Sequence, residues 1–308
     1  MFGADNPFLP QARLVVRVLR HVAEEPSLAL KAGTAINLFF RELPRLSVDI
    51  DLAYTLVQDR GQSLTEIGAA LRRIAQRAEQ ALPGVRVRTQ EADRGKLVTQ
   101  EGRATVMVEV NTVLRGSVYP CERRAALPVV EGLFGDVEAQ VLSFEDLFAG
   151  KIVAALDRQH PRDLFDVKLL LDAEGLSERL LDAFVVYLAS HDRPMAEVLE
   201  PREKDIRAAY EREFGQMTAG PVKFDDLLDA RRRLVIELRG GLRQRHREFL
   251  RSIKRLAPDW SLLPVPHAAE LPGIRWKLHN LEILRREQPK RYESALAKLD
   301  AVLDGFRG

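Results

Sequence analysis

Cysteine is almost absent from this sequence, since Cys121 is the only one among 308 residues. A single cysteine excludes an internal disulfide and argues against a zinc site built on cysteine, so a reducing, cytoplasmic compartment is expected. The chain also lacks an apolar run of about 18 residues, and its N-terminus lacks the basic start and apolar stretch of a signal peptide. We therefore expect neither a membrane span nor a membrane partner.

Net charge is also small, at +2, but the two signs are unevenly placed along the chain. Residues 201–308 contain 23 Lys and Arg against 16 Asp and Glu, whereas residues 1–200 contain 24 against 29. This asymmetry indicates an acidic half that carries the chemistry and a basic half that faces a polyanion. Hydrophobic residues make up 46%, which is typical of a globular protein.

Hydrophobic periodicity divides the chain into a mixed half and a helical half, at residues 1–142 and 143–308. We expect an α+β fold, in which a mixed sheet flanked by helices is followed by an all-helical domain. The expected strands are 28–31, 46–54, 85–92, 96–101, 105–113 and 137–142, and the expected helices are 11–24, 33–42, 63–82, 144–157, 162–173, 178–190, 202–213, 224–238, 242–256, 276–287 and 289–304.

Two acids, Asp49 and Asp51, stand one residue apart in the otherwise apolar run RLSVDIDLAY. On a strand they project from the same face, where their charges repel unless a cation lies between them. Magnesium suits such a pair, because it prefers carboxylate oxygens and is usually completed by water and substrate phosphates. The alternative is a solvent-exposed strand face that carries two acids.

A glycine and a threonine, Gly33 and Thr34, lie between an expected strand and an expected helix. Backbone N–H groups at a helix N-terminus favour a phosphate, and the Thr34 hydroxyl adds a polar group there. The alternative is a tight turn with Thr34 as the helix N-cap. Together with the acid pair, the first interpretation predicts nucleotide chemistry.

A third acid, Glu109, lies in the alternating run TVMVEVNTV. If this strand neighbours residues 46–54, Glu109 joins the acid pair, and three carboxylates can hold two metal ions. Two metals can activate the attacking oxygen and stabilise the leaving oxygen of an in-line displacement. The alternative is a glutamate at the edge of a sheet.

A lysine and two aspartates follow in SFEDLFAGKIVAALDRQHPRDLFDVKLLLD. Lys151 lies at the edge of an apolar helix stripe, from which it can lean into a cleft or extend to water. Asp166 lies on the apolar face of the next helix and needs a partner, for which Lys151 is the candidate. Lys151 can then contact a triphosphate. Asp163 is in the first turn, where an acid complements the helix dipole.

The segments KAGTAINLFF, RLSVDIDL and EDLFAGKIVAALDRQHPRDLFDV, in this order, resemble the AbiEii/AbiGii toxin family of nucleotidyltransferases, and PGIRWKLHNLEIL resembles it near the C-terminus. The resemblance implies a DNA polymerase β-like core that transfers a nucleotide from an NTP, with Mg²⁺, to the 3′ CCA end of tRNA. It also implies that Asp49 and Asp51 bind the metal and that Lys151 and Asp166 complete the active site. Ala32 stands where a glycine is commoner in the family.

The resemblance further implies a toxin that blocks aminoacylation and stops growth, with a cognate antitoxin as its partner, in a toxin–antitoxin or phage-defence system. Ser47 matches a hydroxyl residue that antitoxins phosphorylate in some relatives. A phosphate there would add charge beside the acids and disrupt metal and nucleotide binding. The expected nucleotide-binding residues are Gly33, Thr34, Ser47 and Lys151.

Arginines recur every four residues in the basic half, a spacing that places them in one row on a helix, although Gly240 and Gly241 can break its start. Such a row suits RNA phosphates, without DNA readout; the alternative is a solvated face with salt bridges. The row consists of Arg239, Arg243, Arg247, Arg251 and Arg255.

The function we expect is transfer of a nucleotide to RNA. A small-molecule or protein acceptor and a nucleotide-binding regulator without turnover remain open.

Overall fold

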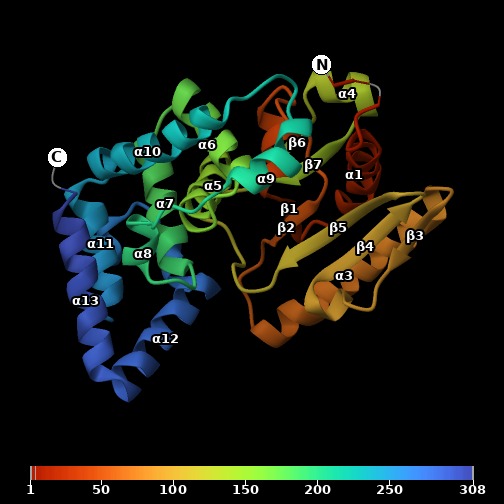
Figure 1. Cartoon of the computed structure of the whole chain (residues 1–308). Helices are drawn as coiled ribbons and strands as arrows, with labels where there is room; N and C mark the ends of the chain where they lie inside the picture. The colour runs from red at the N-terminus through yellow and green to blue at the C-terminus, as the bar shows by residue number, and fades with distance from the viewer. Residues whose placement is uncertain (1, 4, 307–308) are drawn as a thin grey trace. The chain divides into compact units, whose positions relative to one another are not determined.

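The computed structural model describes the chain except residues 1, 4, 307 and 308, and the chain forms two compact units (Figure 1). The first unit contains Met1–Ser143 and Arg212–Val222, and the second contains Phe144–Glu211 and Lys223–Gly308. The expected α+β class, a mixed sheet followed by helices, is confirmed. The sequence placed a boundary at residues 142/143 but did not predict that residues 212–222 return to the first unit.

The first unit is built around a seven-stranded sheet with the order β3-β4-β5-β2-β1-β7-β6. β2 is parallel to β5 and β1 is parallel to β7, whereas the other neighbours are antiparallel, so the sheet is mixed. The strands are β1 (Leu28–Leu30), β2 (Ile50–Tyr54), β3 (Val85–Arg88), β4 (Lys96–Glu101), β5 (Ala104–Asn111), β6 (Glu122–Ala125) and β7 (Glu138–Val141).

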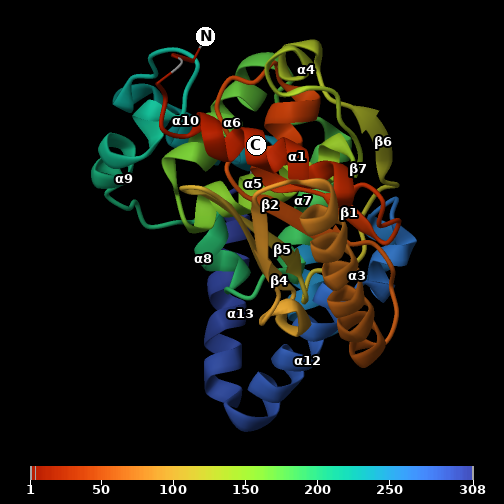
Figure 2. The ribbon, with the colours of Figure 1, turned by 90° about the vertical axis from the view of Figure 1, so that its right-hand side faces the viewer.

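Two long helices, α1 (Leu9–Val22) and α3 (Arg60–Ala81), pack on the sheet (Figure 2). Each buries an apolar stripe of helical period, as the sequence pattern predicts. α3 begins three residues before its expected start, because the Asp59 side chain accepts hydrogen bonds from the N–H groups of Gly61 and Gln62.

Short elements complete the first unit: α2 (Ala32–Ala35), a π-helix (Ile36–Phe40) that continues it, and α4 (Pro128–Phe134). α4 and β6 were not predicted, because α4 is too short to show a clear period and β6, with the sequence ERRA, contains no apolar run. The returning segment pairs with the chain just before β2. Leu46 N–H donates to the Met217 carbonyl over 2.7 Å, and Ala219 N–H donates to the Pro44 carbonyl over 2.9 Å.

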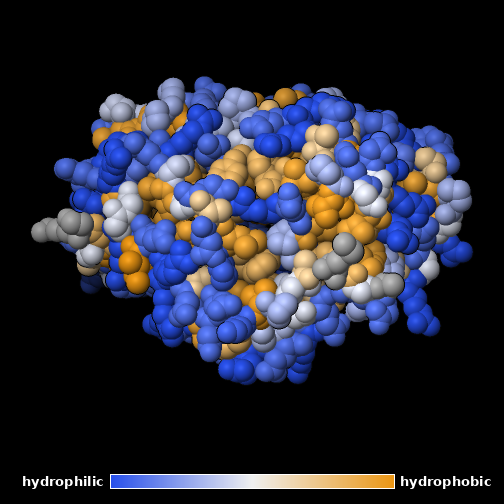
Figure 3. Space-filling view, turned by 90° about the horizontal axis from the view of Figure 1, so that it is seen from above, coloured by the Kyte–Doolittle hydropathy of each residue, from blue (hydrophilic) through white to orange (hydrophobic). Residues whose placement is uncertain are grey.

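The second unit is helical, as expected, and the described residues include no helix that is long and apolar enough to cross a membrane. Figure 3 shows hydrophilic side chains over much of one face of the molecule, with apolar side chains between them. The helices after β7 are α5 (Phe144–Asp157), α6 (Pro161–Ala173), α7 (Glu178–Ser190), α8 (Met195–Leu199), α9 (Arg207–Arg212), α10 (Phe224–Gly241), α11 (Gln244–Lys254), α12 (Pro272–Glu287) and α13 (Pro289–Asp304).

Candidate active site

The acid pair lies where the chain enters β2. The strand begins at Ile50, so Asp51 is its second residue, while Asp49 precedes it; the expectation that both belong to a strand from residue 46 is wrong. Both residues are half-buried, whereas Ile50 and Leu52 are fully buried on the other side of the strand. The strand therefore fixes the direction of Asp51 toward the accessible side of the sheet.

Glu109 lies beside Asp51, since β2 and β5 are neighbours and the two residues are in register. Its carboxylate is 3.2 Å from Nζ of Lys96 on β4, and both side chains are more than one-third exposed. Glu109 is therefore on the same sheet face as Asp51 but is already paired with a cation.

These carboxylates suit a magnesium ion better than a metal that is coordinated entirely by protein side chains. Within the described part of the chain, no three His, Cys, Asp or Glu side chains come together as a ready ligand set. Magnesium does not need such a set, because it commonly takes one or two protein carboxylates and completes its shell with water and substrate phosphates. Asp49 and Asp51 suit that mode of binding.

Thr34 connects the Gly33–Thr34 motif to the loop that carries the acid pair. Its Oγ1 atom is 2.7 Å from Oγ of Ser47 and also contacts the carbonyl oxygen of Asp49. The side chain is fully buried within α2, whose N-cap is Lys31, so the N-cap interpretation of Thr34 is wrong. Thr34 therefore positions the loop that carries Ser47 and Asp49.

A side chain that the sequence analysis missed explains the glycine at position 33. The guanidinium of Arg45 lies against Gly33, so that a Cβ atom at this position would be 2.6 Å from Nη2 of Arg45. Arg45 is 2% exposed, and its Nη1 donates to the Leu46 carbonyl over 3.1 Å. Position 33 is small because a buried arginine occupies the adjacent space.

Ala32 has a backbone conformation that favours glycine, with a φ of +56°. The sequence departs from the commoner family pattern at this position, and the departure leaves an alanine in the left-handed region. That conformation costs roughly 1–2 kcal/mol for a residue with a Cβ atom. The turn before α2 is therefore held by its surroundings, which include the backbone hydrogen bond from Lys31 N–H to the Asp51 carbonyl.

In the second unit, Lys151 of α5 forms a buried ion cluster with two aspartates of α6. Its Nζ is 2.8 Å from Asp163 and 3.0 Å from Asp166, and the three side chains are at most 4% exposed. The expected pairing of Lys151 with Asp166 is therefore observed, and extension of Lys151 to water is excluded. Asp163 does more than complement a helix dipole, because it also pairs with Arg158.

Burial raises the pKa of the Asp163 carboxyl, but the charges of Lys151 and Arg158 and their hydrogen bonds outweigh it. The net effect holds the pKa of Asp163 well below its usual range, so Asp163 is ionised in the folded protein. An ionised carboxylate buried this deeply depends on its cations. The cluster thus ties α5 to α6.

The arginine row is divided and internally paired. α10 ends at Gly241 and α11 begins at Gln244, so the row is broken near its start, at the glycines that the sequence indicated. Arg251, with an 11% exposed side chain, contacts three carboxylates and holds α11 against α13. The partners are Glu200 for Arg239, Glu178 for Arg243, the Leu242 and Phe306 carbonyls for Arg247, Glu248, Asp300 and Asp304 for Arg251, and Asp300 for Arg255.

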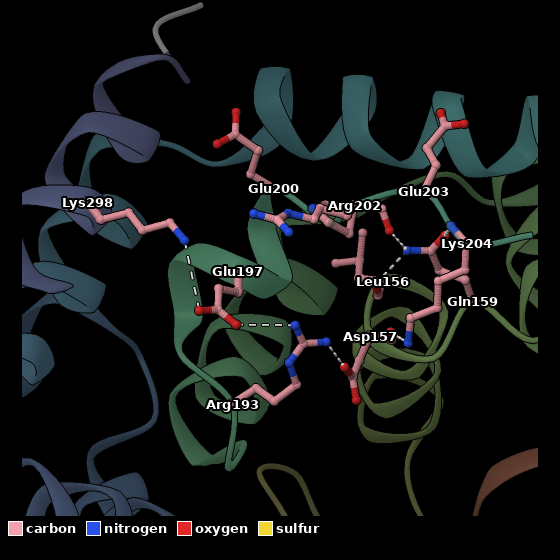
Figure 4. Close-up of a pocket in the computed structure, with 11 residues that line it drawn as sticks. Leu156, Asp157, Gln159, Arg193, Glu197, Glu200, Arg202, Glu203, Lys204 and Lys298 are labelled. Carbon is pink, nitrogen blue, oxygen red and sulfur yellow. Dashed lines mark hydrogen bonds and ion pairs between the residues drawn. The ribbon is translucent and has the colours of Figure 1, made fainter.

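A pocket of about 390 Å³ in the second unit contains none of the expected site residues (Figure 4). Its wall is strongly charged, but much of the charge is paired within the wall. Arg193 lies between Asp157 and Glu197 and pairs with both, and Nζ of Lys298 is 3.8 Å from Glu197. We therefore place the candidate active site at the acid pair and not in this pocket.

Comparison with solved structures identifies the fold. MenT4, the nucleotidyltransferase toxin Rv2826c from Mycobacterium tuberculosis H37Rv, matches 96% of this chain over 95% of its own, with a TM-score of 0.60 and 17% identity. An H. pylori protein proposed to be a nucleotidyltransferase matches 77% of this chain over 94% of its own, with 16% identity and a TM-score of 0.44, too low to establish a common fold. No curated protein gives a significant match. The fold is that of a nucleotidyltransferase toxin.

The family follows from the sequence. The model of the family described as nucleotidyl transferase AbiEii toxin, Type IV TA system, matches residues 13–280. The chain belongs to this family, which confirms the resemblance drawn from the motifs. It is a nucleotidyltransferase toxin of a Type IV toxin–antitoxin system, and an antitoxin is its implied partner.

Proposed function

We propose that this toxin transfers a nucleoside monophosphate from an NTP to the 3′ end of an RNA, with tRNA as the acceptor. The observation that carries the proposal is the accessible carboxylate of Asp51, in register with Glu109 and two residues from Asp49. Addition to the CCA end would prevent aminoacylation and thereby block translation.

In this reaction the acceptor 3′-hydroxyl oxygen attacks the α-phosphorus of the NTP. A new phosphorus–oxygen bond forms, the bond to the β-phosphate oxygen breaks, and pyrophosphate leaves; the hydroxyl proton passes to a neighbouring carboxylate or to water. Magnesium, held by Asp49 and Asp51 with Glu109 beside them, would supply the charge that offsets the triphosphate. Thr34 keeps the loop with Asp49 in place through its contact with the Asp49 carbonyl.

The remaining members of the proposed site act through neighbours. Lys151 and Asp166 enter through the family resemblance, and their ion pair makes each depend on the other. Ser47 is half-buried, and Oγ lies 2.7 Å from Thr34 Oγ1. Phosphorylation of Ser47 by an antitoxin would break this contact and add negative charge next to Asp49, which would inactivate the toxin.

Incubation of the purified protein with magnesium, total tRNA and each α-labelled NTP in turn tests the proposal. We expect label on tRNA with at least one nucleotide, and loss of that label in Asp49→Ala and in the presence of a chelator. Transfer of label to a small molecule or a protein would instead change the acceptor class. Binding of NTP without transfer to any of these acceptors would contradict the proposal and identify a regulator without turnover.

A further inference from the structure

The sheet face that carries Asp51 and Glu109 continues across β5, β4 and β3. Residues paired in adjacent strands project from the same face, so the strand register defines which side chains share it. We call this surface the β3–β5 platform. Its members are Thr105, Met107 and Glu109 on β5, Lys96, Val98 and Gln100 on β4, and Arg86 and Arg88 on β3.

The platform is the accessible side of these strands. On the opposite side Val106, Val108 and Leu97 are buried, and that side packs against α1 and α3 (Figure 2). Met107 is 37% exposed although its neighbours along β5 are buried, and both platform arginines are exposed. An exposed methionine in the middle of a strand suits contact with a ligand, because its flexible apolar side chain adapts to the partner.

The platform carries cations that no carboxylate neutralises. Arg86 and Arg88 form no ion pair within the described part of the chain, whereas four arginines of the helical row each pair with a carboxylate: Arg239, Arg243, Arg251 and Arg255. As residues i and i+2 of a strand they project together, roughly 7 Å apart. Two exposed guanidinium groups at this spacing form a surface for the phosphates of a nucleic acid.

The chemical character of the side chains changes across the platform from β3 to β2. The order runs from the arginines of β3, past the apolar side chains Val98 and Met107, to Glu109 and Asp51, over three strand spacings of roughly 14 Å in total. A single-stranded nucleic acid is complementary to these groups. Its phosphates bind cations, and its bases pack on apolar surface.

We infer that the β3–β5 platform binds the single-stranded 3′ end of the RNA acceptor. The phosphates bind Arg86 and Arg88, a base packs on Met107 and Val98, and the terminal nucleotide points toward the acid pair. The inference rests on the proposed function, because it names the surface that presents the acceptor hydroxyl. The apolar side chains Val98 and Met107 beside the arginines argue for RNA over an acidic antitoxin segment, because bases pack on apolar surface.

Binding without turnover tests the platform. The probe is a short fluorescein-labelled single-stranded RNA ending in CCA, with no NTP, and its affinity is measured by anisotropy over a series of salt concentrations. The test variant is Arg86→Gln/Arg88→Gln, and the matched control is Arg285→Gln/Arg286→Gln, which removes two exposed arginines of α12. Urea unfolding of each variant verifies that the fold is retained.

Loss of two phosphate contacts should weaken binding about tenfold or more at low salt and reduce the slope of log affinity against log salt by about 1.4. Met107→Asp should weaken binding several-fold, because it places a negative charge among the phosphates. The control should match the wild-type protein. Unchanged affinity and slope in Arg86→Gln/Arg88→Gln, an equal loss in the control, or no binding of the probe by the wild-type protein would overturn the inference.

Three further outcomes separate the platform from the proposed function and from an antitoxin-binding surface. Transfer to RNA that persists unchanged in Arg86→Gln/Arg88→Gln would overturn the platform and leave the function intact. RNA binding that depends on these arginines, without transfer to RNA by the wild-type protein, would support the platform and contradict the function. A loss confined to binding of the antitoxin, with RNA affinity unchanged, would assign the surface to the antitoxin and overturn the inference.

Discussion

The two carboxylate clusters of this protein are placed in opposite environments. Asp51 and Glu109 lie on an accessible sheet face, where Asp51 has no ion pair within the described part of the chain. Asp163 and Asp166 are buried around Lys151 at ion-pair distance. Carboxylates left accessible and close together can bind an external cation, whereas buried and paired carboxylates stabilise the packing of two helices. In the proposed function the first cluster carries the chemistry, whereas the ion pairs of the second hold α5 against α6.

The largest effect should come from breaking the buried cluster. Lys151→Met leaves two buried aspartates without this cation, so we expect the free energy of unfolding to fall by about 3–5 kcal/mol. Urea unfolding measures this loss. The triple variant Lys151→Met/Asp163→Asn/Asp166→Asn should recover part of the lost free energy of unfolding, because it also removes the two carboxyl groups that Lys151 pairs with. If Lys151→Met abolished nucleotide transfer without any change in unfolding, Lys151 would be a substrate contact and the comparison would fail.

Lys277 is a second buried lysine, and it differs from Lys151 because it has no carboxylate at ion-pair distance within the described residues. Nζ of Lys277 donates to the carbonyls of His191 and Arg193, and the residue is 7% exposed. Burial and then the charge of Lys254 lower the pKa of Lys277 to about 8, although Asp192 raises it. Its ordinary pKa of about 10.4 applies to the unfolded chain.

Between these two pKa values the unfolded state binds more protons than the folded state, so stability should rise with pH. We expect the wild-type protein to gain about 2 kcal/mol relative to Lys277→Met between pH 7.5 and 10, measured by urea unfolding at both values. An equal pH dependence in the two proteins would show that Lys277 titrates normally and that burial without a carboxylate does not disfavour its charge.

The smallest effect concerns the turn that supports the accessible cluster. Ala32→Gly relieves a left-handed alanine but increases the entropy of the unfolded chain, so the net stabilisation should be at most about 1 kcal/mol. Ala35→Gly, in the same helix with an ordinary conformation, is the matched control and should destabilise by about 1 kcal/mol. Thermal unfolding of the two variants should move in opposite directions. Destabilisation by both would show that the conformation of Ala32 carries no strain.

Sequence patterns predicted those features that depend on local period. The alternation of β5 and the apolar stripes of α1 and α3 predict their buried faces, and Asp49 and Asp51 stand out because acids are rare in an apolar strand. The adjacency of Glu109 and Asp51 could be stated only as a condition, since strand order depends on tertiary pairing. The shorter β2 shows that strand ends are the weakest part of such a prediction.

What the sequence could not provide was the identity of partners far along the chain. Arg45 against Gly33, the return of residues 212–222, and the carboxylates that neutralise Arg243 and Arg251 are all products of folding. The same limit explains the exposed arginines of β3. They were not part of any motif, and only the absence of partners within the described chain distinguishes them from the helical row.

The most direct test of the central claim compares Asp51→Asn with the wild-type protein, using α-labelled NTPs, magnesium and tRNA, beside urea unfolding of both. We expect the variant to lose nucleotide transfer at least about a thousandfold, since the proposed metal would contribute several kcal/mol, while the free energy of unfolding changes by less than about 0.5 kcal/mol. Label transferred equally by both proteins would contradict the account, because the accessible cluster would then not carry the chemistry.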